Sequence, residues 1–128
     1  MRTRYAVTVG AVVGFGLGAV AVQAIHAQAK PPVYYIAEID IKNMDAYTKE
    51  YVPRAQAGIK AAGGRILAAG SKITAIEGAP PKSRVAVQVW DSVEKIQAWR
   101  NSAEFKEARR IGDKYAKFRA FAVEGIAQ

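Results

Sequence analysis

The sequence has no cysteine and only one histidine, His26, among its 128 residues. The absence of thiols excludes disulfide bonds, metal or iron–sulfur sites with cysteine ligands, and a thiolate nucleophile. A chain of this length suits a single domain. Three broad classes of mechanism are therefore excluded before any motif is considered.

The N-terminal segment differs from the rest of the chain, because residues 5–25 carry no charged side chain. Two arginines precede an apolar run from Ala6 to Val22, and Ala27-Gln28-Ala29 has the spacing of an export cleavage site. This pattern predicts a secretory signal peptide over residues 1–29, cleaved before Lys30, and a mature domain in the periplasm or outside the cell. The alternative is an uncleaved inner-membrane anchor with the domain facing the periplasm, because the uncharged run is long enough to span a bilayer.

The predicted mature domain lacks histidine as well as cysteine, because His26 is lost with the signal peptide. These residues are the commonest ligands for transition metals, so we expect no metal site and no cofactor such as haem. Seventeen basic residues remain against eleven acidic ones. They are scattered singly, which is typical of a solvated surface and argues against a nucleic-acid partner. Attraction to an anionic ligand or a lipid surface stays open.

The mature domain alternates between strand and helix patterns without a repeat or a dividing linker, so one core is expected. β-Branched and aromatic residues, or alternation with period two, predict the strands. They are Val33–Asp40, Arg65–Ala69, Ile73–Glu77, Arg84–Trp90 and Arg119–Glu124, the second and third joined as a hairpin through Gly70-Ser71-Lys72.

Apolar residues at spacings of three and four predict the helices. Asn43 caps the first helix, Gly63 ends it, and Pro53 predicts a kink near Tyr51. The last helix is predicted to run to Phe118. Capping boxes open the two later helices, at Asp91–Glu94 and at Asn101–Glu104. With the hairpin Arg65–Glu77 counted as one unit, the order β-α-β-β-α-α-β is a ferredoxin-like α+β pattern with the second helix broken in two.

Several short motifs occur in an order and spacing typical of one protein family. They are Tyr34-Tyr-Ile-Ala-Glu-Ile-Asp40, Gly63-Gly-Arg-Ile-Leu67, Ile76-Glu-Gly78, Ser102-Ala-Glu-Phe105 and Arg109-Arg110. Over residues 33–124 the chain resembles the domain of unknown function family numbered 1330, which is similar to the dimeric α+β barrel superfamily. The resemblance implies a ferredoxin-like fold whose sheet pairs face to face with that of a second copy. Phe105 stands where the family has a tyrosine, which argues against a catalytic acid at that position.

A four-stranded sheet with helices on one side leaves its second face uncovered. We assign Tyr35, Ala37, Ile39, Val85, Val87 and Val89 to the helix-covered face, and Ile36, Glu38, Gln88 and Trp90 to the other. A mixed apolar patch of that kind on a small domain is best covered by another copy, so the sequence predicts a homodimer with a two-fold interface.

The candidate site residues are charges within strands and polar aromatics on helices: Glu38, Tyr51, Arg65, Glu77, Arg84 and Trp99. The charged residues either form cross-strand salt bridges, such as Glu77 with Arg84 or Arg65, or build a carboxylate pocket at the sheet edge. In the pocket, Arg65 or Arg84 would make the bidentate contact.

The polar aromatics are ambiguous in the same way. Tyr47, Tyr51 and Trp99 fall on apolar helical stripes, so they either pack in the core or reach a cleft with their polar atoms. We assign Arg109 and Arg110 to a solvated helix face.

Two classes of function remain. The first is binding of a small organic molecule, apolar or acidic, in a cavity between sheet and helices. The second, suggested by the resemblance to α+β barrels that include monooxygenases and isomerases, is a cofactor-independent enzyme with Glu38 or Glu77 as general base and an arginine stabilising the developing anion. The two are distinguished by whether either glutamate lies unpaired in a closed apolar cavity.

Overall fold

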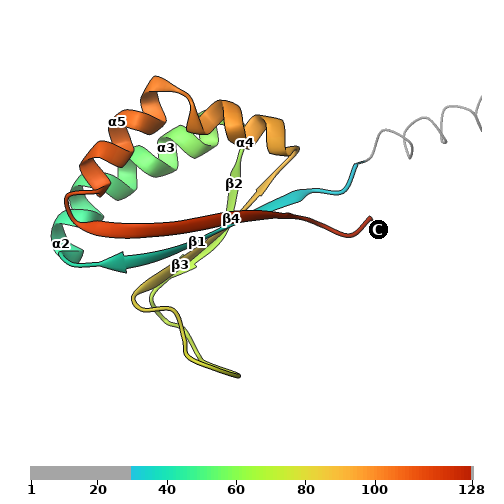
Figure 1. The fold of residues 1–128 in the computed structure, drawn as a ribbon. Helices are drawn as coiled ribbons and strands as arrows, with labels where there is room; N and C mark the ends of the chain where they lie inside the picture. Colours follow the sequence, from blue (N-terminus) through green and yellow to red (C-terminus); the bar gives the residue numbers. More distant parts are fainter. Residues whose placement is uncertain (1–29, 128) are drawn as a thin grey trace, which may run out of the picture. The chain divides into compact units, whose positions relative to one another are not determined.

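The computed structural model describes residues 30–127, which form an α+β fold of four antiparallel strands and three helical segments (Figure 1). The strands are β1 (Val33–Ile41), β2 (Arg65–Gly70), β3 (Arg84–Trp90) and β4 (Ala116–Glu124). The helices are α2 (Met44–Ala46), continued by a π-helical turn (Tyr47–Tyr51) into α3 (Val52–Ala62), then α4 (Val93–Arg100) and α5 (Ala103–Gly112). The predicted signal peptide lies outside the described residues. Within residues 30–127 no helix has the length and hydrophobicity needed to cross a bilayer.

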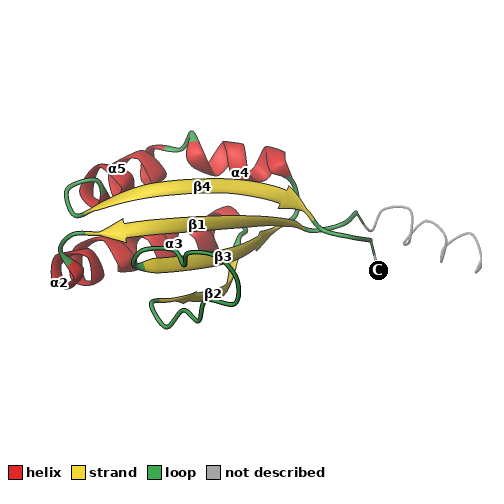
Figure 2. Ribbon diagram, turned by 60° about the horizontal axis from the view of Figure 1, so that its bottom comes forward, coloured by secondary structure: helices red, strands yellow, loops and turns green. Residues whose placement is uncertain are grey.

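The sheet has the strand order β2-β3-β1-β4, and all helices cover one of its faces (Figures 1 and 2). The predicted ferredoxin-like order is thus confirmed. The predicted strand Ile73–Glu77 is wrong, because these residues belong to a loop that joins β2 to β3 and extends to the side away from the helices (Figure 1). β2 pairs directly with β3 and not with this segment, whose residues after Ile73 are exposed.

Strand register corrects our assignment of faces on β3. Tyr35 of β1 lies opposite Gln88, and Val33 lies opposite Trp90. Directly opposed residues share a face, so Gln88 and Trp90 lie under the helices, where both are buried. Val85, Val87 and Val89 lie on the uncovered face instead. Because side chains alternate between the two faces of a strand, an error of one residue reverses the assigned face of every residue on β3.

The first helix follows its predicted signals closely. The Asn43 side chain accepts a hydrogen bond from the Ala46 N–H at 3.1 Å, and Gly63 ends α3 with φ of 103°. The expected irregularity near Tyr51 takes the form of the π-helical turn just before Pro53, which has no N–H to continue the ladder. These features place Tyr47 and Tyr51 on the core side of the helix, where both are buried.

The last helix is shorter than predicted. It ends at Gly112, and the segment expected to continue the helix to Phe118 pairs with β1, with Ala116 opposite Ile41 and Phe118 opposite Ile39. Strand pairing here overrides the helical spacing of the apolar residues. The N-cap residues of α4 and α5 are Ser92 and Ser102. Each lies one residue after the first residue of its predicted capping box.

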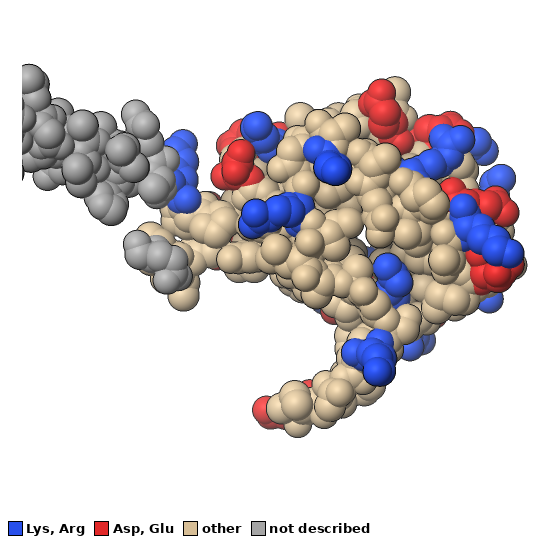
Figure 3. Space-filling model, turned by 180° about the vertical axis from the view of Figure 1, so that it is seen from behind, with Lys and Arg blue, Asp and Glu red and all other residues tan. Residues whose placement is uncertain are grey.

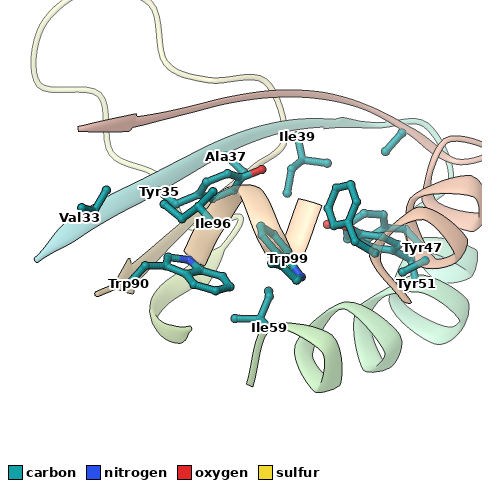
Figure 4. Packing of buried hydrophobic residues seen from close by; sticks show 13 residues of the cluster. Val33, Tyr35, Ala37, Ile39, Tyr47, Tyr51, Ile59, Trp90, Ile96 and Trp99 are labelled. Atoms are coloured by element: carbon teal, nitrogen blue, oxygen red, sulfur yellow. The ribbon is translucent and has the colours of Figure 1, made fainter. Parts of the chain in front are cut away.

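The core lies between the sheet and the helices. Trp90 lies at one end of it, Tyr47 and Tyr51 lie at the other, and Trp99 lies between them (Figure 4). Aromatic rings pack in contact along this line: the Trp90 and Trp99 centroids are 5.0 Å apart and those of Tyr47 and Tyr51 are 5.1 Å apart. The candidate site is built into this aromatic layer.

Candidate ligand-binding site

A narrow cavity lies between the helix-covered face of the sheet and the helices. Its volume is about 50 Å³, enough for a few water molecules at about 10 to 15 Å³ each by the same measure. Gln56 of α3 and Ala69 of β2 line it and are exposed, which places its mouth between these two elements. The lining is mainly apolar, and its polar members are Tyr35, Tyr47, Tyr51, Gln56, Arg84, Gln88, Trp99 and Arg109.

Arg109 of α5 is fixed by two aromatic rings. Its guanidinium carbon lies 3.8 Å from the ring centroid of Phe118 and 4.9 Å from that of Phe105. Such stacking suits the planar guanidinium and limits its freedom. The Nε atom of Arg109 is buried and has no hydrogen-bond partner among the described residues. A buried donor left in this state costs roughly 1–3 kcal/mol, more for a charged group, unless water or a ligand accepts its hydrogen bond.

Arg84 brings a second guanidinium to the cavity. It is the first residue of β3, and its guanidinium carbon lies 5.9 Å from the ring centroid of Tyr47. Neither Arg84 nor Arg109 forms an ion pair with a carboxylate in the described part of the chain. No aspartate or glutamate is among the described residues that line the cavity. The potential in the cavity is therefore positive.

Tyr47 and Tyr51 supply two buried phenols. Burial raises the pKa of Tyr47 from 10.0 to about 12, with a further increase from neighbouring Tyr51, whereas the charges of Arg84 and Arg109 act in the opposite direction. Burial also raises the pKa of Tyr51, against the charge of Arg109. Both phenols are therefore neutral near pH 7 and can donate a hydrogen bond.

Two further polar side chains of the wall have partners. Trp90 Nε1 donates to Gln88 Oε1 at 2.9 Å, and Arg100 donates to the Tyr35 hydroxyl at 2.7 Å. The NH₂ group of Gln88 remains as a donor.

The structure brings together three of the six predicted site residues, namely Tyr51, Arg84 and Trp99. Glu38 lies on the uncovered face of the sheet, where it accepts a hydrogen bond from Arg119 at 2.8 Å. The other two, Arg65 and Glu77, are exposed on β2 and on the loop between β2 and β3. The salt bridge expected between Glu77 and an arginine is not formed within the described residues.

Five polar residues of the cavity lining were not among the predicted site residues: Tyr35, Tyr47, Gln56, Gln88 and Arg109. The assignment of Arg109 to a solvated face is wrong. It lies four residues after Phe105 and three before Gly112, both buried, so helical spacing was the available signal. Arg110, by contrast, is exposed and pairs with Glu107 at 2.7 Å. Residues 30–127 hold no group of three or more histidine, cysteine, aspartate or glutamate side chains that could bind a metal ion.

Comparison with known families agrees with this architecture. The family model described as domain of unknown function DUF1330 matches residues 32–126. The chain belongs to the DUF1330 family. No functionally curated protein matches this DUF1330 chain.

Solved structures share the fold at low identity. A protein of unknown function from Rhodopseudomonas palustris is 13% identical, with 84% of this chain and 94% of that chain covered and a TM-score of 0.63. SnoaB, a cofactor-independent oxygenase from Streptomyces nogalater, is 10% identical, with 77% and 96% covered and a TM-score of 0.58. A Caulobacter crescentus protein provisionally named an antibiotic biosynthesis monooxygenase is 12% identical, with 77% and 92% covered and a TM-score of 0.57. These structures share the ferredoxin-like α+β fold of this chain.

Proposed function

We propose that this DUF1330 protein binds a small organic molecule in the cavity between its sheet and its helices. The observation that carries the proposal is the Arg109 side chain, which lines a mainly apolar cavity beside neutral phenols and whose buried Nε has no hydrogen-bond partner among the described residues. Apolar walls with a few fixed polar groups are typical of small-molecule sites. A ligand would offset the cost of the unsatisfied donor, so the same atoms that weaken the empty protein favour the complex.

We also propose that the protein is exported and acts as a homodimer. The uncovered face of the sheet is apolar along three strands, and on β4 Phe121 is 44% and Val123 is 53% exposed. Ile36 lies opposite Phe121, and Val87 lies opposite Ile36. The loop between β2 and β3 projects on the same side (Figure 1), whereas charges gather over the helices (Figure 3). A second copy placed against this face would cover the patch.

Native mass spectrometry of protein purified from cells that express the full chain tests these proposals together. It reports the N-terminal residue, the oligomer and any retained ligand. We expect a chain that begins at Lys30, a dimer, and a bound species lost on denaturation. A sample that stays monomeric at micromolar concentration would refute the dimer. If the parent protein is a dimer, Phe121→Asp should convert it to a monomer. Failure of any molecule, retained or added, to bind in the cavity would refute the ligand-binding proposal.

A cofactor-independent oxygenase is the second candidate, favoured by the fold that the chain shares with SnoaB. Neither glutamate considered as a base lines the cavity, since Glu38 is paired on the opposite face and Glu77 is exposed. Tyr47 and Tyr51 are neutral near pH 7 and therefore serve as donors rather than bases. Oxygen uptake with small phenols such as 4-hydroxybenzoate tests this candidate. Uptake that Arg109→Gln abolishes and Arg110→Gln preserves would establish it.

A further inference from the structure

We infer that the ligand is a small organic carboxylate, held by Arg84 and Arg109 at its charged end and by Trp99 along its apolar part. The inference rests on the proposed function and names the chemical class that this cavity selects. Three features of the lining carry it: its charge, its hydrogen-bonding polarity and its size.

The charge of the lining is uncompensated. Arg84 and Arg109 both line the cavity, and none of the described residues beside them is a carboxylate. The Nε atom of Arg109 is buried without a hydrogen-bond partner in the described part of the chain. Partial removal of a guanidinium group from water without an opposite charge is costly, and an anion bound beside it offsets that cost. Arginine also presents the fork of donors that matches a carboxylate in two parallel hydrogen bonds.

The hydrogen-bonding polarity of the lining selects an acceptor. The two guanidinium groups can only donate, and the neutral phenols of Tyr47 and Tyr51 donate in the presence of an anion. The Gln88 oxygen accepts a hydrogen bond from Trp90 at 2.9 Å, and its NH₂ group remains as a donor. A carboxylate accepts only, so it matches the donors that dominate this set. A neutral amide of the same shape brings an NH₂ group that finds no charged acceptor there.

The apolar part and the volume limit the size of the ligand. Trp99, Ile59 and Ile66 contribute apolar surface to the lining. A volume of about 50 Å³ is well below the roughly 150 Å³ of an engineered cavity that holds benzene. The cavity therefore encloses the carboxylate end of a short-chain ligand, and the alkyl chain extends past Trp99 to the mouth between α3 and β2.

Butyrate and butyramide, which differ in charge but hardly in shape, test the inference. The chain has two tryptophans, Trp90 and Trp99, so a nitrogen-15 NMR spectrum of the purified protein gives two indole N–H signals. We expect butyrate to shift the Trp99 signal and to bind roughly tenfold or more tightly than butyramide, since hydrogen bonds to charged groups are the stronger ones. Arg109→Gln and Arg84→Gln should each remove most of this preference. Arg110→Gln is the matched control and should leave it unchanged.

Each other outcome has a definite meaning. Equal binding of butyrate and butyramide would overturn the carboxylate inference and leave the proposed function standing. Failure of both probes to bind would overturn the inference and count against the proposed function as well. Sodium chloride at the same concentration must not reproduce the shift, because an inorganic anion with equal effect would overturn the organic part of the inference. If Arg109→Gln does not give a dispersed spectrum, Arg84→Gln decides, because Arg84 lies at a strand end and is not fully buried.

Discussion

Gly64 is the residue whose substitution tests the packing around the site most directly. It connects α3 to β2, and a Cβ atom placed on it would lie 2.5 Å from Cε2 and Cζ2 of Trp90 and 2.9 Å from Cγ2 of Ile59. Non-bonded carbon atoms normally approach to about 3.5 Å. Trp90 is only 2% exposed and bonded to Gln88, so its ring has no free space to enter. Gly64→Ala must therefore displace Trp90 or Ile59, and Ile59 is part of the cavity lining.

The expected magnitude follows from two opposing effects. Overpacking a close-packed site costs about 1–3 kcal/mol, and replacing glycine restricts the unfolded chain and returns about 0.4–1 kcal/mol. We expect the free energy of unfolding of Gly64→Ala to fall by roughly 1–2 kcal/mol, and Tm to fall by about 4–8 °C for each kcal/mol in a domain of this size. Urea unfolding followed by tryptophan fluorescence, at fixed protein concentration, measures this change in the free energy of unfolding.

The matched control is Gly58→Ala in α3. A Cβ atom there meets only Trp99 Nε1, at an ordinary 3.9 Å, so this variant should be more stable than the parent by roughly 0.5–1 kcal/mol. In a Trp90→Phe background, Gly64→Ala should lose most of its cost, because the overlapping ring atoms are gone. Equal stability of Gly64→Ala and Gly58→Ala in the parent would refute the close approach of Gly64 to Trp90.

Three further predictions address other parts of the molecule. Because the pKa of Tyr47 rises from 10.0 to about 12 on folding, its contribution to stability is complete below pH 10 and is lost as the pH rises toward 12. The unfolding free energy of Tyr47→Phe should therefore decline less over that interval. An absorbance titration of the same variant should show one late-ionising phenol fewer. Ser92→Ala removes the acceptor of the Lys95 N–H at 3.1 Å and should cost about 0.5–2 kcal/mol in thermal unfolding, whereas Ser92→Asp should cost little. Glu38→Gln breaks the pair with Arg119 on the uncovered face, so it should cost at most about 1 kcal/mol and leave butyrate affinity unchanged; a loss of affinity would contradict the placement of Glu38 outside the site.

Local signals predicted most of the elements, because their causes are local. The side chain of Asn43 caps the start of the first helix by accepting a backbone hydrogen bond, and Gly63 ends the helix with a left-handed backbone. Both effects act within a few residues. The failures occur where distant pairing decides. Phe118 has helical spacing from the residues before it, yet it joins β4 because Ile39 of β1 lies opposite it. The segment Ile73–Glu77 has strand composition but pairs with no strand, so it remains a loop.

The site was only half predictable for a related reason. Tyr51, Arg84 and Trp99 were marked by residue type alone, whereas Gln88 depended on the face of β3, which only its register with β1 determines. Arg109 adjoins Arg110, and two adjacent arginines resemble a solvated pair. Successive residues of a helix point about 100° apart, so one can face Phe118 while the other faces Glu107.

The excess of basic residues acquires a specific meaning from this arrangement. A positive surplus that is spread over the surface is solvated and carries no information about a ligand. In this protein two of the surplus charges, Arg84 and Arg109, line an internal cavity, while the ion pairs among the described residues use other groups. Aromatic rings hold the Arg109 charge in place even without a counterion, at 3.8 Å from Phe118. The fold therefore preserves a charge that it does not neutralise, and an acidic ligand is the partner that such a site lacks.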